Sequence, residues 1–290
     1  MLYAGKEYAY VLMLGALLLS LESQAYHSES VLSRLSPYSL NRYARKVHTQ
    51  SGEDGIIEEI FKRLNVQEGF CVEFGAYDGI TISNTRYLWE QGWSGVSIEA
   101  SAGPFEKLQK LYNNQPRMVC INAFVLPESS ATNGRTFDEI AREFFPNKEI
   151  DFLSIDIDGA DYLILESLEC KPKVICIEGG FCWHPLLNTR IPDNYALQNL
   201  QQPLSIMTSI ANAKGYTPIC MEGGNLFLIR DDLSHFFSQV PQDALTLWRD
   251  GWRSLPQKSR DHILNWRKNH AILHRFEGDL CTQMPITNDF

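Results

Sequence analysis

Two hydrophobic spacings alternate along the middle of the chain. The segment EDGIIEEIFKRL, residues 53–64, repeats its apolar residues along one helix face, with acids in its first turn and Lys62 and Arg63 near its end, as the helix dipole favours. The segment GFCVEF, residues 69–74, is a short and nearly continuous apolar run, which is typical of a strand covered on both faces. We therefore expect a helix and then a buried strand where the regular part of the chain begins.

The same alternation continues to about residue 230. Strands that alternate with helices at this spacing predict an α/β fold with a doubly wound, mostly parallel sheet. The last segment, YTPICMEGGNLFLIR at 216–230, predicts an antiparallel terminal hairpin that turns at Gly223 and Gly224. Further strands are expected in residues 95–100, 117–125, 150–157 and 173–180, and further helices in residues 83–92, 104–114, 136–145, 160–168 and 203–215.

The pattern divides the chain into three predicted parts. A Rossmann-like domain is expected over 49–231, after an apolar and helical N-terminal flank, 1–48, and before a helical tail, 232–290. The tail contains three tryptophans, and Pro256 is expected to open a helix that runs to about His274. We expect this tail to pack on the domain, with contact to an acceptor or to a membrane as the alternatives.

The N-terminal flank contains an uncharged apolar stretch, YAYVLMLGALLLSL at 8–21. It is shorter than the roughly 20 residues of a membrane span. It resembles a signal-peptide core, and Ser23, Gln24 and Ala25 have the small-x-small pattern of a cleavage site. The alternative is a helix packed on the domain or on a membrane surface. The weak basic region before this stretch favours a cytoplasmic protein over a membrane-associated or exported one.

Composition narrows the class of protein further. The 290 residues include 26 Lys and Arg against 35 Asp and Glu, a net charge of −9, which disfavours a nucleic-acid partner. The seven cysteines form no CxxC pair, and Cys71, Cys120 and Cys176 lie in apolar, strand-like runs. We interpret them as buried thiols of a reducing compartment rather than a disulfide framework.

Ligand chemistry is predicted where the first two strands end. In a doubly wound sheet, ligands bind beyond the carboxyl ends of the strands. VEFGAYDG, residues 72–79, supplies glycines there but neither GxGxxG nor a Walker lysine, so it predicts no phosphate cradle. Glu99 ends the next strand, where an acid can accept both hydroxyls of a ribose. Together these features predict a nucleoside cofactor without a pyrophosphate, a description that S-adenosylmethionine fits.

A group of acids is predicted at the ends of two later strands. SIDIDGADY places Asp156, Asp158 and Asp161 at a strand end and helix start, and Glu178 ends the next strand. Carboxylates that lie so close need a cation, a proton or solvent between them. We expect Asp158 to act as general base on an acceptor hydroxyl and Asp156 to face the cationic groups of the cofactor. A Mg²⁺ site at Asp158 and Glu178, or helix capping by Asp158 or Asp161, remains open.

The loop after Glu178 supplies a second candidate base. It runs over residues 179–202 and is expected to form a lid over the acceptor. His184 lies in it and titrates near neutral pH when unperturbed, so it is a candidate catalytic residue beside Asp158.

These segments resemble the FkbM-type class I S-adenosylmethionine-dependent methyltransferases, in family order, over about Ser51 to Arg230. The resemblance implies a seven-stranded sheet with the cofactor over the first two strand ends, and Glu99 on the ribose. It places Asn122 and Ala123 near the adenine. It assigns the methionine part to Glu73, Gly75, Ala76, Tyr77 and Asp78. The matching stretches are SGEDGIIEEIF, FCVEFGAYDG, SNT, GWSGVSIEAS, DFLSIDIDGADY and VICIEGG.

The chain departs from the family directly after Glu178. Gly179 and Gly180 stand where relatives commonly carry an aromatic residue and Asn, so an Asn that could contact a metal or an acceptor is absent. GGNLFLIR also differs, since relatives tend to have Asn-Ala before the aromatic pair. The resemblance implies O-methylation of a sugar, glycan or natural-product hydroxyl. A catalytically inactive binding module is the alternative, whereas the missing GxGxxG disfavours a nicotinamide-dependent oxidoreductase.

Overall fold

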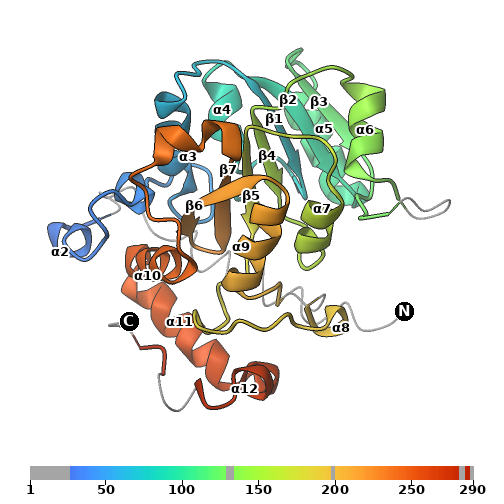
Figure 1. Cartoon of the computed structure of the whole chain (residues 1–290). Coiled ribbons are helices and arrows are strands. Elements are labelled where there is room, and N and C mark those ends of the chain that lie inside the picture. The colour runs from blue at the N-terminus through green and yellow to red at the C-terminus, as the bar shows by residue number, and fades with distance from the viewer. Residues whose placement is uncertain (1–26, 129–133, 197–199, 281–284, 288–290) are drawn as a thin grey trace.

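The computed structural model describes residues 27–128, 134–196, 200–280 and 285–287. A seven-stranded sheet in the order β3-β2-β1-β4-β5-β7-β6 forms its centre (Figure 1). Neighbouring strands from β3 to β5 are parallel, and β7 is antiparallel to both β5 and β6. The predicted fold is therefore confirmed, with the hairpin at one end of the sheet. The strands are β1 (Phe70–Phe74), β2 (Ser94–Glu99), β3 (Met118–Asn122), β4 (Phe152–Ile155), β5 (Val174–Glu178), β6 (Tyr216–Glu222) and β7 (Asn225–Arg230).

Helices cover both faces of the sheet because its strands bury apolar side chains on both sides. On β1, Val72 and Phe74 join the core under α6, α7 and α9, whereas Cys71 joins the core under α3. The helices of the α/β part are α3 (Glu53–Arg63), α4 (Arg86–Glu90), α5 (Ala102–Tyr112), α6 (Phe137–Phe144), α7 (Asp161–Ser167), α8 (Asp193–Ala196) and α9 (Leu204–Ala213).

Local sequence signals explain several of these boundaries. Helix α3 starts at Glu53, as its pattern predicted, and ends at Arg63. Thr136 and Glu139 form a reciprocal capping box at the start of α6. The β6–β7 turn lies at Gly223 and Gly224 as predicted, and Gly223 adopts a φ of +58°.

The described parts of both flanks, apart from α2, which buries none of its residues, share the core of the sheet. They comprise α2 (Glu29–Leu32), η1 (Leu40–Tyr43), η2 (Asp231–Phe237), α10 (Ala244–Ser254), α11 (Gln257–Lys268) and α12 (Ala271–Glu277). Leu40 is buried beside α3, and Trp248 and Trp252 of α10 are buried in the same core as Val72. The two Trp rings stack with centroids 5.2 Å apart. The tail therefore packs on the domain, below the sheet in Figure 1.

One predicted helix is wrong in its extent. The helix expected from Pro256 to about His274 is two helices, α11 and α12, with a break at Asn269 and His270. The ring of His270 stacks on Trp266 with centroids 3.6 Å apart. The break turns α12 back, so that Glu277 reaches Arg267 of α11 in an ion pair of 2.7 Å. A continuous helix could not form this pair.

The apolar stretch at 8–21 lies outside the described residues. Within the described ranges, no helix combines the length and apolar character that crossing a membrane requires. The six described cysteines are free, and Cys71 and Cys176 are buried as predicted, whereas Cys120 is half-buried.

Candidate functional site

The loop after β1 lies against the end of β4. Gly75 has a φ of +77°, and a Cβ at this position would lie 1.6 Å from the carbonyl oxygen of Asp156. Only glycine fits there. Ala76 beyond it is buried, and Tyr77, with a φ of +47°, has an exposed ring. The loop therefore presents backbone and an aromatic ring beyond the strand ends.

Glu99 ends β2 beside this loop. Its Oε2 accepts the backbone N–H of Tyr77 at 2.8 Å, and its Oε1 accepts that of Ser101 at 2.6 Å. Each carboxylate oxygen keeps a further lone pair, so the group fits two more hydroxyl donors. Asn122, at the end of β3, is exposed but donates its amide to the carbonyls of Glu99 and Ala100. It therefore joins β3 to β2.

The Glu73 carboxylate bonds to residues that follow the glycine-rich loop. It is buried, and it accepts hydrogen bonds from the Ser83 hydroxyl, the Asn84 backbone and the Thr85 hydroxyl, at 2.7 to 2.8 Å. Burial raises its pKa, although these bonds oppose the rise. The Glu73 side chain thus holds residues 83–85 in place. Its contact with the methionine part of a cofactor stays a prediction.

Asp78 also fixes a turn. Its carboxylate accepts the backbone N–H groups of Ile80 and Thr81 and the Thr81 hydroxyl. Burial opposes ionisation, but these bonds outweigh it and lower the pKa of Asp78. Asp78 therefore holds the glycine-rich loop in shape.

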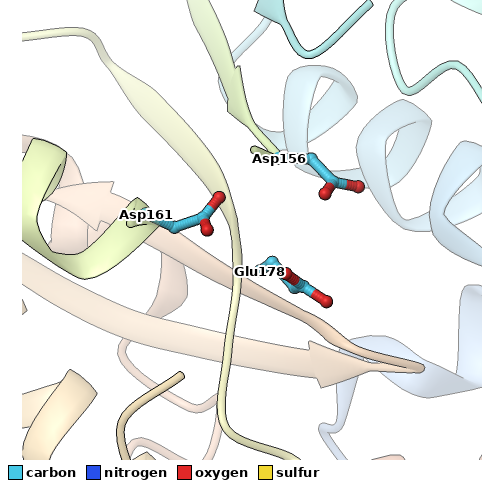
Figure 2. Close-up of side chains that lie close together, drawn as sticks. All are labelled: Asp156, Asp161 and Glu178. Carbon is cyan, nitrogen blue, oxygen red and sulfur yellow. The ribbon is translucent and has the colours of Figure 1, made fainter. Parts of the chain in front are cut away.

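Three carboxylates converge at the other half of the sheet. Asp156 follows β4, Asp161 begins α7 and Glu178 ends β5 (Figure 2). One oxygen from each lies within 4.8 Å of the others, and we name these three residues the carboxylate cluster. Asp156 and Glu178 are half-buried, whereas Asp161 is fully buried. Burial, and then the neighbouring negative charges, raise the pKa values of Asp156 and Glu178 well above their ordinary range.

Asp161 is bound by backbone, but not as a helix cap. It accepts the N–H groups of Ile157 and Gly159, both at 2.9 Å. The residue before α7 is Ala160, and no side chain caps the helix, so the expected cap by Asp158 or Asp161 is wrong. Asp158 and Gly159 both adopt positive φ, which turns the loop so that Asp161 faces back into it. Burial raises the pKa of Asp161 to about 6.

Gln201 is a site residue that the sequence did not reveal. Its Nε2 donates to Asp161 at 2.5 Å and to Glu178 at 2.8 Å. The residue is 2% exposed and has a φ of +49°. The signal was weak, because a glutamine in a long loop has no periodicity that places it beside two carboxylates.

Asp158 lies outside the carboxylate cluster. The residue is exposed overall, with a φ of +61°, and partial burial of its carboxyl group raises its pKa. The predicted metal pair of Asp158 and Glu178 is therefore replaced by Asp156, Asp161 and Glu178 as the carboxylates that meet.

His184 is not an exposed loop residue. It is 1% exposed, its Nδ1 accepts the N–H of Leu186, and its backbone N–H donates to Glu277 of α12 at 2.7 Å. The expectation of a lid base is corrected, because the C-terminal helices bury this part of the loop. Phe181 and Trp183 beside it belong to the main core.

The Gly-Gly departure has a structural reason. A Cβ on Gly180 would lie 1.8 Å from the carbonyl oxygen of Gln202, whereas a Cβ on Gly179 would meet only ordinary contacts. Gly180 forms a β-bridge with Pro203. The second glycine therefore lets the 201–203 segment approach the end of β5, which brings Gln201 to the carboxylate cluster.

A family model adds independent information about this half of the sheet. The model of the methyltransferase FkbM domain matches residues 128–185, from before α6 to the loop after β5. The resemblance to FkbM-type methyltransferases is thereby confirmed. None of the curated proteins matches the chain significantly.

Weaker similarities to solved structures accompany the FkbM match. A putative caffeoyl-CoA O-methyltransferase from Staphylococcus aureus has 13% identity and a TM-score of 0.42, over 77% of this chain and 99% of that one. The CMeT domain of the citrinin polyketide synthase has 13% identity and a TM-score of 0.39, over 63% of this chain and 54% of that domain. Fibrillarin from Methanococcus jannaschii has 14% identity and a TM-score of 0.39, over 57% and 67%.

Proposed function

We propose that the chain is an S-adenosylmethionine-dependent methyltransferase that methylates a hydroxyl of a small molecule or glycan. The observation that carries the proposal is Glu99, which ends β2 beside the Gly75 loop with one lone pair on each oxygen left for a ribose diol. The FkbM domain match supports the same class of reaction.

The residues beyond β1 and β2 fit this cofactor. Glu99 would hold the ribose, and the exposed Tyr77 ring and Ala76 would flank the nucleoside and methionine parts. S-adenosylmethionine, when bound, supplies an electrophilic methyl group. Because Gly75 has no Cβ, the loop after β1 packs directly against the backbone of Asp156. This contact fixes the distance between the loop after β1 and the end of β4.

Asp158 remains our candidate general base. An acceptor hydroxyl needs to lose its proton as it attacks, and an exposed carboxylate with a raised pKa is suited to take that proton. We expect Asp158→Ala to reduce turnover at least about 100-fold, the lower end of general-base contributions, with unchanged cofactor affinity. Full turnover in this variant would remove Asp158 from the mechanism.

Calorimetric titration with S-adenosylhomocysteine tests the proposal directly. We expect micromolar binding by the full chain, and Glu99→Ala should weaken it about 10- to 100-fold, since two charge-assisted hydrogen bonds are lost. Glu169→Ala is the matched control, because that carboxylate is exposed and pairs with Arg142 at the surface. A folded protein that binds no cofactor would favour the inactive binding module. Repeating the titration with Mg²⁺ tests whether a metal contributes.

We propose that the chain divides into three parts, with boundaries after residues 48 and 231. The six free cysteines of the described residues agree with a reducing, cytoplasmic location.

A further inference from the structure

The carboxylate cluster differs from two other buried acids of the protein, which pair with cations. Glu277 pairs with Arg267 at 2.7 Å, and Asp151 pairs with Lys173 at 2.7 Å. Within the described part of the chain, no ion pair involves Asp156, Asp161 or Glu178. Glu73 is also buried without an ion pair among the described residues, but it lies among three hydrogen-bond donors. Three carboxylates that converge on one another without a cation are different, because like charges so close need a cation, a proton or solvent between them.

The hydrogen bonds inside the cluster leave only acceptors free. Asp161 accepts three N–H groups, from Ile157, Gly159 and Gln201. Glu178 accepts only Gln201, through Oε2, and the Asp156 carboxylate accepts no side-chain or backbone donor among the residues that the structure describes. The carboxylate oxygens that accept no hydrogen bond among the described residues are therefore both oxygens of Asp156 and Oε1 of Glu178.

Gln201 adds an independent observation. The residue is only 2% exposed, and its Oε1 is buried without a hydrogen-bond partner in the described ranges. The structure orients the amide with Nε2 toward the cluster, because a carbonyl oxygen there would face the ionised carboxylates of Asp161 and Glu178. The Oε1 atom is thus a fixed acceptor on an amide that already lies between two members of the cluster. A buried carbonyl without a donor calls for a ligand that supplies one.

These groups select one ligand chemistry. The free atoms require a positive charge and several N–H donors in a small volume, and a primary ammonium has both. A divalent metal fits less well, because three N–H groups already occupy most of the acceptor positions of Asp161, and the Gln201 N–H groups point between Asp161 and Glu178. Asp156 and Glu178 are half-buried, so a ligand from solvent can reach them.

We propose that the carboxylate cluster and the Gln201 carbonyl bind a primary ammonium group of the methyl acceptor. The inference rests on the proposed function and narrows its substrate class to amine-bearing hydroxyl compounds, such as amino sugars. The cofactor itself carries an α-ammonium group of the same chemistry, so the test has to separate the two sources. The position of the cluster at the ends of β4 and β5, beside the Glu99 half of the sheet, favours the acceptor.

The test is calorimetry on the full chain saturated with S-adenosylhomocysteine, so that the cofactor's own ammonium is already bound. Glucosamine is titrated against glucose, and a panel of primary amines is titrated against the corresponding alcohols, so that each pair differs only at the amine. We expect at least tenfold tighter binding of the amine member in some of these pairs. Glu178→Gln and Asp156→Asn should each reduce that preference about tenfold, because each removes one charge from the contact. Glu169→Gln, at an exposed surface pair, should leave the preference unchanged.

Each alternative outcome has a distinct meaning. Absence of any amine preference in protein that binds S-adenosylhomocysteine would overturn this inference and leave the proposed function standing. Amines that compete with S-adenosylhomocysteine would assign the cluster to the cofactor and overturn the acceptor assignment. Binding of Mg²⁺ that Glu178→Gln abolishes would replace the ammonium by a metal. Failure to bind S-adenosylhomocysteine at all would overturn the proposed function, and this inference with it.

Discussion

The strand-end carboxylates of the two halves of the sheet have opposite surroundings. The first half contains β1 to β3 with Glu99, and the second half contains β4 to β7 with the carboxylate cluster. Glu99, at the end of β2, accepts a backbone N–H on each oxygen. Asp156 and Glu178, at the ends of β4 and β5, face other carboxylates and have raised pKa values. A satisfied acid can orient a neutral diol, whereas an unsatisfied group of acids stores repulsion that a cation relieves. Position at a strand end therefore does not determine what an acid binds.

The largest expected effect lies where the two halves touch. Gly75→Ala should place a methyl group against the Asp156 carbonyl, at a φ that a side chain rarely adopts. We expect the free energy of unfolding to fall by about 3 kcal/mol or more, because neither backbone segment can move independently. Urea denaturation measures this change.

Gly103→Ala is the matched control for that substitution. Gly103 lies in α5 with nothing within 4 Å of a new Cβ. It should raise the free energy of unfolding by a few tenths to about 1 kcal/mol, as alanine favours a helix. Equal stability of the two variants would show that the halves are not held together at Gly75.

The next effect concerns the side-chain amide of Gln201, which donates to two carboxylates of the second half. Gln201→Glu would place a fourth acid between Asp161 and Glu178 and remove both N–H donors. We expect a loss of about 2–3 kcal/mol at pH 8, since buried unpaired charges cost more than lost neutral bonds. The loss should shrink toward pH 5, where the added acid takes up a proton.

Asn122→Ala provides the counterpart in the first half. Its amide donates to two carbonyls at an exposed position, so its loss should cost about 1 kcal/mol or less at either pH. A pH-dependent loss in Asn122→Ala, or a pH-independent one in Gln201→Glu, would break the distinction between the halves.

The sequence predicted the fold and the strand-end acids, because both depend on local periodicity and on where parallel strands end. The hairpin at Gly223 and the acids Glu99 and Glu178 all lie where the pattern placed them. The sequence did not predict the contacts that irregular segments make. Gln201 and His184 belong to a loop whose path depends on Gly180 and on the C-terminal helices, and no spacing rule encodes that path.

The sequence also did not predict how the side chains at strand ends are oriented. Asp158 is two residues from Asp156 but lies outside the carboxylate cluster, because its positive φ turns the loop. Glu73 precedes the glycine-rich loop, yet the polar residues 83–85 surround its carboxylate. A sequence places such residues on an element, and only the backbone decides which of them meet.

The effect of neutralising a strand-end acid on stability should have opposite signs in the two halves. Asp156→Asn removes a repelled charge without removing a hydrogen bond among the described residues, so it should stabilise the protein. Burial and the neighbouring acids raise the folded-state pKa of Asp156 above its unfolded value. The folded state therefore binds more protons, and the wild-type free energy of unfolding falls as pH rises from about 4 through the folded pKa. The variant lacks this fall, so its advantage should grow with pH.

Thermal unfolding at pH 5, 7 and 8.5 measures this advantage. We expect about 1–2 kcal/mol at the highest pH, or roughly 2–8 °C in Tm for a chain of this size, and little at pH 5. Glu99→Gln should instead lower Tm at every pH, because it weakens two bonds from the backbone at Tyr77 and Ser101. If the amine-bearing acceptor binds as inferred, saturating ligand should abolish the advantage of Asp156→Asn, since the cation relieves the same repulsion that the substitution removes. An advantage that persists at all pH values and with ligand would mean that Asp156 is destabilising for a reason other than its charge.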